Sequence, residues 1–419
     1  MSNNTQPEIR FPGFTEDWEE RKLNEGMTEY TDRVYIQDDE IYKQVSVKNV
    51  GEITLRGEQI GSKIGRKRQA KVNLIEHPDT LIFTRQTIEQ GGIGFAPKET
   101  DGAIVTENMP TIDVDNDIIN CNYLLAYVKT EDWYRKVILK NIEGGTAQIA
   151  IHEDSILSSE VLIPKIEEQQ KIGTFFKQID DTIALHQSKL DLLKETKKGF
   201  LQKMFPKNGA KVPEIRFPGF TEAWEQRKFF DNIKNTIDFR GRTPKKLGMD
   251  WSVSGYLALS ALNVKNGYID PSVDAHYGNQ ELYDKWMSGK ELYKGQVLFT
   301  TEAPMGNVAQ VPDNNKYILS QRTIAFELYS DKITDDFLAV LLRSPQSYNK
   351  LLSLASGGTA KGVSQKSLSQ FIVTLPKDLD EQQKIGSFFK QLDDTIALHQ
   401  RKLDLLKEMK KGFLQKMFV

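Results

Sequence analysis

The chain carries one long stretch twice, EQQKIGTFFKQIDDTIALHQSKLDLLKETKKGFLQKMF at residues 168–205 and EQQKIGSFFKQLDDTIALHQRKLDLLKEMKKGFLQKMF at residues 381–418. The copies match at 34 of 38 positions. In each copy apolar residues recur at alternating intervals of four and three, as at Ile172, Phe176 and Ile179. This period of 3.5 is typical of a helix that packs along another helix. At 1.5 Å per residue, each copy predicts a rod roughly 55 Å long.

Two arrangements would bury the apolar seam of these rods. One is pairing between chains, as in a dimerisation element, and the other is antiparallel pairing of the two copies within one chain. Because the copies lie 213 residues apart in the same chain, we expect the intramolecular pair. Gly199 and Gly412 interrupt the helical pattern, where glycine costs about 1 kcal/mol relative to alanine. We interpret them as points of close approach to a neighbour, with a local kink as the alternative.

A second element is also duplicated. The segment PEIRFPGFTEDWEERKL at residues 7–23 returns as PEIRFPGFTEAWEQRKF at residues 213–229, with 14 of 17 positions identical. In each copy a Pro-Gly turn precedes a threonine, Thr15 or Thr221, which we expect to cap a short helix. We call residues 7–23 and 213–229 the leads. The chain therefore consists of two successive copies of one layout, in which a lead is followed by a variable segment and then by a rod.

The segments between lead and rod, residues 24–163 and 230–375, differ almost everywhere. Short apolar runs separated by Gly, Asn and Asp predict mostly β structure, with helices near residues 122–139 and 335–352. The expected fold is α+β, with two mostly-β domains joined by two long antiparallel helices in a pseudo-two-fold repeat. The expected divisions are a first recognition domain at 1–166, a helix at 167–206, a second recognition domain at 207–379 and a helix at 380–419.

Composition sets few limits. The chain has 419 residues, 27% charged residues, a net charge of −2 and one cysteine, Cys121. A single cysteine excludes an intramolecular disulfide framework. The polar beginning of the sequence and the lack of an apolar run approaching 18 residues predict a cytoplasmic protein without membrane contact.

Basic clusters occur in both variable segments. Residues 56–71 hold six basic residues against one acid, and residues 240–246 read RGRTPKK. Such clusters suit a DNA backbone, and nearby polar triplets offer groups for base edges; a solvated surface is the alternative. The Gly-Gly-Thr loops at 144–146 and 357–359 are either phosphate cradles or tight turns. The candidate DNA-binding residues are Lys48, Arg66, Lys67, Arg68, Lys71, Arg85, Gln86, Thr146, Arg240, Arg242, Lys245, Lys246, Lys265, Gln321, Arg322, Thr359 and Lys361.

Motifs for catalysis are missing. The sequence has no GxxxxGK[ST], HExxH or CxxC pattern, its five histidines do not cluster, and it lacks the Asn/Asp-Pro-Pro-aromatic motif of amino-methylating enzymes. We therefore expect no catalytic residue, no metal site and no cofactor in this chain, and we expect any chemistry to belong to another chain.

The duplicated layout resembles a known family. Two variable domains, each ending in a Gly-Gly-Thr loop and in IPK…EEQQKI or LPK…DEQQKI at the start of a long helix, are similar to the specificity subunit of Type I restriction–modification systems. The resemblance covers the whole chain and is strongest at residues 162–173 and 375–386.

The resemblance implies a non-enzymatic subunit that binds double-stranded DNA. Each variable domain would read one half of a split, asymmetric site, and the antiparallel rods would set the spacing of the halves. Two methyltransferase subunits that bind S-adenosylmethionine would dock on the rods, and two restriction subunits would supply ATP- and Mg-dependent chemistry. Four phenylalanines on the rods are our candidate docking residues: Phe175, Phe176, Phe388 and Phe389.

Another class of function also fits the layout. The rods and variable segments would suit a coiled-coil scaffold with two protein-binding domains and no role in DNA recognition. The discriminating observation is whether an assembled complex containing this chain methylates a split DNA motif.

Overall fold

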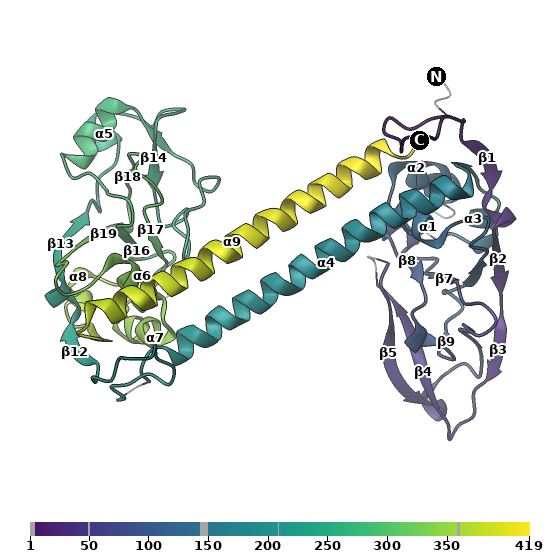
Figure 1. Ribbon diagram of the computed structural model, residues 1–419, viewed down its shortest axis with the longest axis horizontal. Coiled ribbons are helices and arrows are strands. Elements are labelled where there is room, and N and C mark those ends of the chain that lie inside the picture. Colours follow the sequence, from purple (N-terminus) through teal and green to yellow (C-terminus); the bar gives the residue numbers. More distant parts are fainter. Residues whose placement is uncertain (1–4, 49–50, 143–149, 208, 358–360) are drawn as a thin grey trace. The chain divides into compact units, whose positions relative to one another are not determined.

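The computed structural model describes residues 5–48, 51–142, 150–207, 209–357 and 361–419 (Figure 1). The chain divides into two compact units: a first unit of residues 1–187 with 402–419, and a second unit of residues 188–401. Each unit contains part of both long helices, α4 (Ile166–Lys203) and α9 (Leu379–Lys416). The two predicted helices are therefore confirmed.

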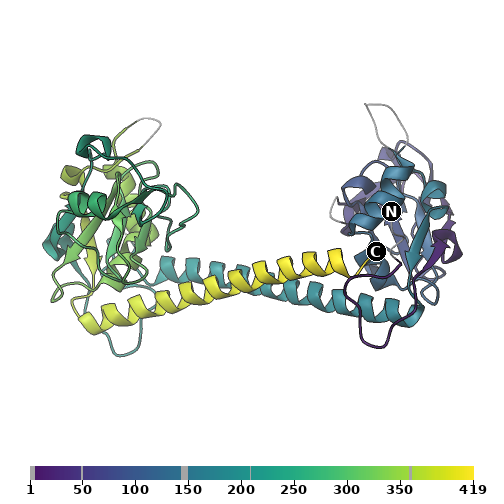
Figure 2. The same ribbon diagram turned by 90° about the horizontal axis from the view of Figure 1, so that it is seen from above.

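Within each unit the segments of α4 and α9 lie side by side and run in opposite directions (Figures 1 and 2). In the first unit the rings of Phe175 and Phe413 lie 5.1 Å apart, and Lys410 pairs with Asp180. In the second unit the same separation joins the rings of Phe200 and Phe388. Leu190, which continues the predicted spacing, and its counterpart Leu403 in the second copy are each 1% exposed. The antiparallel intramolecular pair is confirmed, and pairing between chains is not needed to bury the seam.

The first unit holds two larger sheets and a ribbon. One sheet is antiparallel, in the order β2-β10-β7-β8, and the other has the order β3-β6-β9-β4-β5 with β9 parallel to β4. Their bounds are β2 (Met27–Tyr30), β3 (Asp32–Tyr35), β4 (Ile41–Val47), β5 (Ile53–Ile60), β6 (Arg68–Lys71), β7 (Thr80–Phe83), β8 (Ile93–Phe95), β9 (Ile104–Val105) and β10 (Thr111–Val114), with β1 (Glu19–Lys22) pairing β11 (Glu160–Ile163).

The second unit repeats this plan with fewer strands in the second sheet. Its antiparallel sheet has the order β13-β19-β16-β17, and its other sheet has the order β15-β14-β18 with β18 parallel to β14. The bounds are β13 (Ile233–Asp238), β14 (Tyr256–Leu259), β15 (Tyr277–Gly278), β16 (Val297–Thr300), β17 (Val308–Gln310), β18 (Ile318–Leu319) and β19 (Thr323–Leu328), with β12 (Glu225–Lys228) pairing β20 (Ile372–Leu375).

The shorter helices pack on the sheets: α3 on β2 in the first unit, and α6 on β16 and β17 in the second, where α5 packs on β15 and β18 of the other sheet. The predicted helices near 122–139 and 335–352 are present, but each is broken by a new cap. Thr130 caps the second piece in the first unit, and Ser344 with Pro345 starts the second piece in the second unit. The helices are α1 (Cys121–Tyr127), α2 (Glu131–Trp133), α3 (Glu153–Leu157), α5 (Gln280–Met287), α6 (Asp335–Arg343), α7 (Pro345–Leu354) and α8 (Gln365–Leu368). Shorter helical turns are η1 (Leu23–Glu25), η2 (Gly61–Lys63), η3 (Ile88–Gln90), η4 (Lys98–Thr100), η5 (Tyr134–Ile138), η6 (Leu139–Asn141), η7 (Phe229–Asn232) and η8 (Lys245–Leu247).

The leads correct one expectation. Thr15 and Thr221 do not cap helices, because both leads pass through a turn and irregular chain into β1 and β12 without forming a helix. These strands pair with β11 and β20, which directly precede the long helices. Pairing with a partner strand outweighs the local capping signal, since strand formation depends on tertiary context. Each lead is thereby tied to the start of a long helix.

The glycines of the rods correct another expectation. Gly199 and Gly412 have open space where a Cβ would lie, so they are not points of close approach. That role belongs to Gly173 and Gly386. A Cβ on Gly173 would lie 2.6 Å from the backbone N of Tyr123, and one on Gly386 would lie 2.8 Å from the backbone N of Phe337. Each long helix therefore makes its closest backbone approach to a head domain at its eighth residue, and the residues that follow the helix ends, Phe205 and Phe418, also pack into the head cores.

Within the described part of the chain, no helix combines the length and the apolar character needed to span a membrane.

Candidate nucleic-acid interface

Each unit has a pocket at the same place in its fold. In the first unit the pocket lies where β9 ends and the chain continues as Thr106 and Glu107. In the second unit it lies where β18 ends and the chain continues as Ser320, Gln321 and Arg322. Because β9 and β18 are the strands that run parallel to β4 and β14, the two pockets occupy equivalent positions.

The pocket of the first unit is rich in arginine. It has a volume of about 540 Å³, and one wall comes from β3, β6 and β9 while another comes from β2 and β10. Its charged lining residues are Glu29, Arg33, Arg66, Arg68, Arg85 and Glu107. Four guanidinium groups against two carboxylates give this recess a positive balance, which favours an electron-rich ligand such as a base edge or a phosphate.

Most of the basic residues predicted here are paired with acids. Arg66 pairs with Glu107, and Lys67 pairs with Asp38. The two pairs Lys71–Asp32 and Lys48–Glu52 have N–O distances of 3.4 and 2.7 Å. Gln86 is exposed but outside the pocket lining. Arg68 is exposed, lines the pocket and has no ion pair or side-chain hydrogen bond among the described residues. Thr146 lies outside the described residues.

Arg85, a predicted residue that lines the first pocket, is anchored by a carboxylate. Its Nε donates to Oε2 of Glu153 at 2.8 Å, and its Nη2 donates to the other carboxylate oxygen. Burial raises the pKa of Glu153, but the hydrogen bonds from Arg85 and from the backbone outweigh it, so the net shift of that pKa is downward. A bidentate pair of this kind fixes the guanidinium plane at the pocket wall.

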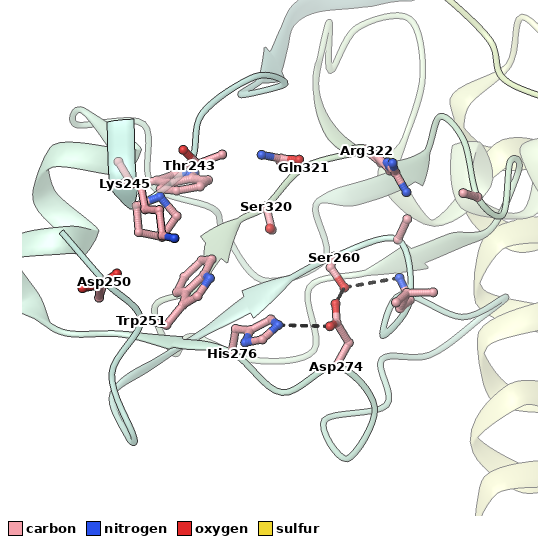
Figure 3. A pocket seen from close by; sticks show the side chains of 15 residues that line it. Thr243, Lys245, Asp250, Trp251, Ser260, Asp274, His276, Ser320, Gln321 and Arg322 are labelled. Atoms are coloured by element: carbon pink, nitrogen blue, oxygen red, sulfur yellow. Dashed lines mark hydrogen bonds and ion pairs between the residues drawn. The ribbon is translucent and has the colours of Figure 1, made fainter. Parts of the chain in front are cut away.

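The pocket of the second unit is lined by aromatic and acidic side chains (Figure 3). Its volume is about 410 Å³. The rings of Trp251 and His276 stack with centroids 5.5 Å apart. Asp274 accepts a hydrogen bond from Ser260 at 2.6 Å and pairs with His276 at 3.1 Å. This recess therefore offers aromatic rings, hydroxyls and carboxylates, whereas four of the six charged side chains that line the first pocket are arginines.

The predicted residues of the second unit divide between this pocket and the scaffold around it. Lys245, Gln321 and Arg322 line the pocket, and Gln321 donates to the carbonyl of Arg242 at 2.5 Å. Arg242 lies 4.3 Å over the ring of Phe239 and donates to the carbonyl of Trp286, so it acts as scaffold. Arg240 pairs with Asp238, and Lys246 donates to the carbonyl of Gly241 at 2.7 Å. Lys265 closes a backbone turn with Tyr268, Lys361 is exposed, and Thr359 lies outside the described residues.

Backbone strain is concentrated at this second pocket. Four non-glycine residues of the described chain have positive φ, and three of them line the pocket: Asp274 at 52°, Ala303 at 48° and Arg322 at 66°. Such conformations persist only where the surrounding structure enforces them, and they gather at functional sites. This is a signal for function that depends on backbone geometry and that the sequence did not reveal.

Sequence reasoning also missed residues that line these pockets. Arg33 lies on β3, and Trp251, Asp274 and His276 lie in loops around β14 and β15. Arg33 falls outside the basic cluster at 56–71, and only the pairing of β3 with β6 brings it beside Arg68. The alternation in Asp32–Tyr35 was the available clue.

The duplicated residues make matching contacts where each lead meets the first turn of a long helix, a region we call the base of the unit. Arg10 donates to both carboxylate oxygens of Glu168 at 2.7 Å, and Arg216 does the same to Glu381 at 2.7 and 2.8 Å. Both glutamates are 1% exposed. The hydrogen bond with Glu168 outweighs desolvation and raises the pKa of Arg10. These pairs join each lead to the first turn of a long helix.

The next glutamine of each rod binds the head domain. Gln169 accepts from the backbone N of Asn120 at 2.9 Å and donates to the carbonyl of Pro164 at 3.0 Å. Gln382 accepts from Thr334 at 3.1 Å and donates to Pro376 at 2.9 Å. The repeated Glu-Gln pair thus holds lead, rod and head together in each unit.

The four phenylalanines proposed for partner docking lie among these contacts. Phe176 and Phe389 are 2% and 0% exposed and belong to the hydrophobic cores. Phe175 and Phe388 are half-buried against Phe413 and Phe200 of the opposite helix. Their observed contacts are within the chain, and a role in docking stays a prediction.

The described residues contain no group of three or more His, Cys, Asp or Glu side chains arranged to hold a metal ion. Cys121, at the start of α1, is half-buried, and burial raises the pKa of its thiol to about 12. A protonated thiol is a poor nucleophile.

The sequence matches the family model of the Type I restriction modification DNA specificity domain twice, over residues 15–195 and 227–408. The chain belongs to this family, and it is accordingly a specificity subunit, a class that leaves catalysis to partner subunits. Among curated proteins it is 23% identical over 321 residues to the Type I restriction enzyme MjaVIII specificity subunit of Methanocaldococcus jannaschii, covering 74% of this chain and 72% of that one.

A second specificity subunit of that organism, MjaX, is 23% identical over 298 residues, a match that spans 70% of this chain and 65% of the relative. Among solved structures, the S subunit of a Type-I restriction-modification system from M. genitalium is 12% identical, covers 99% of both chains and has a TM-score of 0.61. A chain from a structure of a type I R-M system, described in terms of complex assembly and conformational transition, is 17% identical with a TM-score of 0.50, covering 97% of this chain and 98% of that one. At these identities the likeness shows the fold.

Proposed function

We propose that this chain reads a split, asymmetric DNA site, with each unit's pocket face contacting one half-site. The observation that carries the proposal is the contrast between base and pocket. The duplicated leads and rods make the same contacts in both units, whereas one pocket presents arginines and the other presents Trp251, Asp274 and His276. A frame that is the same twice, carrying two unlike recesses, suits recognition of two unlike DNA segments.

The rods would set the spacing of the half-sites. Each helix has 38 residues, which corresponds to roughly 57 Å of helix. This exceeds one turn of DNA, about 34 Å, so the rods are long enough to serve contacts on successive major grooves. Lengthening both helices should therefore change the number of unread base pairs between the halves and leave the halves themselves unchanged.

The rods would also dock two methyltransferase subunits. Each helix carries two leucines seven residues apart with large exposed fractions: Leu185 and Leu192, each 68%, on α4, and Leu398 at 45% and Leu405 at 56% on α9. Exposed apolar side chains at heptad spacing are typical of a helix face that packs on a partner. Two equivalent faces fit two copies of one partner, with two restriction subunits joining the complex and the whole acting in the cytoplasm.

Methylome sequencing tests the proposal. The chain would be co-expressed with its methyltransferase subunit in a host that lacks other adenine methylation. We expect methylation at one motif with two specific halves and an unread spacer. Active methyltransferase that assembles with the chain but modifies DNA at no such motif would contradict the proposal and favour a scaffold function.

A further inference from the structure

We propose that Arg33 and Arg68, on the β3–β6 ribbon of the first unit, read guanine in the major groove and determine the specificity of the first half-site. This inference rests on the proposed DNA-reading function and names the chemistry of one of its two pockets. It concerns the two arginines that the structure leaves available, rather than the basic cluster as a whole.

The two arginines lie on one face of the ribbon. In the antiparallel register Arg33 is opposite Ala70, and Tyr35 is opposite Arg68. Since side chains alternate between the faces of a strand, Arg33, Tyr35, Arg68 and Ala70 share a face, and the two arginines are diagonal neighbours. Arg33, Arg68 and Ala70 all line the first unit's pocket, which places this face on the recess.

Most of the neighbouring cations are already engaged. Arg66, Lys67, Lys71 and Arg85 each pair with a carboxylate of the same unit. By contrast, Arg33 and Arg68 are exposed, and neither has an ion pair or a side-chain hydrogen bond within the described residues. An arginine held by a carboxylate has part of its donor set occupied, whereas these two present complete guanidinium groups to a ligand.

The position of the ribbon suits the major groove. β3 is at the end of the strand order β3-β6-β9-β4-β5, so the ribbon forms the border of its sheet. The major groove admits a two-stranded β-ribbon, and arginine bound in bidentate fashion to O6 and N7 of guanine is the commonest specific contact there. Tyr35, opposite Arg68 and 65% exposed, adds an aromatic surface beside that donor.

Phosphate binding is the competing role for these side chains. Phosphate contacts position a protein on DNA without reading its sequence. Lys67 and Arg66, which also lines the recess, suit that role because an ion pair near the surface is weak and its carboxylate can be exchanged for a phosphate. The unpaired arginines on the recessed face are the ones assigned to base edges.

The test compares Arg33→Ala and Arg68→Ala, alone and together, in the full chain assembled with the methyltransferase. Methylome sequencing measures the motif. The half-site of the first unit is identified as the one that changes when residues 24–163 are exchanged for those of another specificity subunit. We expect each variant to lose discrimination at a guanine position of that half by about 5- to 150-fold, the equivalent of one good bidentate contact. The other half-site should stay unchanged.

Arg66→Ala and Lys67→Ala serve as contrast variants, for which we expect weaker binding to all sequences, a salt slope reduced by about 1 and an unchanged motif. Arg135→Ala, which removes an exposed pair with Glu131, controls for general effects. As a second measurement, 7-deazaguanine in the first half-site, which lacks the N7 acceptor, should weaken wild-type binding but not that of the double variant.

Relaxation at a base other than guanine, an unchanged motif, or uniform weakening by Arg33→Ala and Arg68→Ala would overturn the inference. In those cases a split motif would persist in the wild-type complex, so the proposed function would stand. Absence of any split motif in the wild-type complex would instead remove the proposed function itself.

Discussion

In the first unit Arg10 binds Glu168 at the first turn of α4, and in the second unit Arg216 binds Glu381 at the first turn of α9. Above these matching contacts, one pocket is lined by four arginines and the other by a stacked Trp251–His276 pair with acidic neighbours. The two pockets occupy equivalent places at the ends of β9 and β18. The comparison teaches that different residues carry the structural and the binding roles. Buried residues where lead and long helix meet hold the fold together, and residues of loops and edge strands determine which ligand the pocket suits.

The largest effect is expected at the buried ion pairs of the base. Glu381→Ala should lower the free energy of unfolding by about 3–5 kcal/mol, because it leaves the largely buried Arg216 without its partner. Glu381 also accepts a hydrogen bond from Nε1 of Trp224 at 3.2 Å, whereas Nε1 of Trp18 has no partner among the described residues. Glu168→Ala should therefore cost about 1 kcal/mol less. Denaturant unfolding measures both.

Glu131→Ala is the matched control for this comparison. It breaks an exposed pair with Arg135 and should cost no more than about 0.5 kcal/mol. Equal losses from Glu381→Ala and Glu168→Ala would show that the tryptophan contact does not distinguish the two bases.

The next largest effect is the change in stability when a glycine of the long helices is replaced by alanine. The sign of this change differs between two glycines of the same helix. Gly173→Ala and Gly386→Ala place a methyl group against head-domain backbone and should destabilise by roughly 1–3 kcal/mol. Gly199→Ala and Gly412→Ala meet open space inside a helix and should stabilise by about 1 kcal/mol each. Thermal unfolding of the four variants measures this. Destabilisation by all four would contradict the placement of the close approaches at Gly173 and Gly386 alone.

A smaller effect concerns how stability depends on pH. It differs between the first residues of two equivalent helices, Cys121 of α1 and Asp335 of α6. Burial raises the pKa of Asp335 to about 6, with the nearby Asp336 adding to the shift and the hydrogen bond from Tyr293 opposing it. A carboxyl whose folded-state pKa is raised contributes stability below its unfolded pKa of about 4, and that contribution is lost as pH rises through about 6.

We therefore expect the second unit to lose about 1 kcal/mol between pH 4 and pH 7, after allowance for solvent screening. Asp335→Asn should flatten this part of the pH profile of unfolding. Cys121 has no corresponding step, since its thiol stays protonated throughout this range. A profile that keeps its slope in Asp335→Asn would assign the dependence to other groups.

The long helices and their pairing were predictable from the sequence. The sets of residues that line the two pockets were not. The 3.5-residue period of the rods depends on local spacing alone, so the helices and their antiparallel pairing follow from residues such as Ile172 and Phe176. The pocket residues become neighbours only through strand register, as Arg33 and Arg68 do, or across 68 positions of sequence, as Arg85 and Glu153 do. Charge clustering found Arg66 and Lys67 but could not show that each is paired with an acid. The capping signal at Thr15 failed because pairing of β1 with β11 is a long-range contact.

Exchange of one head tests the central claim most directly. Residues 24–163 would be replaced by the corresponding segment of another specificity subunit, with both leads and both rods retained, and the methylome of cells carrying the assembled complex would be sequenced. The account predicts a motif in which one half-site is new while the other half-site and the spacer are unchanged. A change in both half-sites would contradict it, because the two heads would then not read independently.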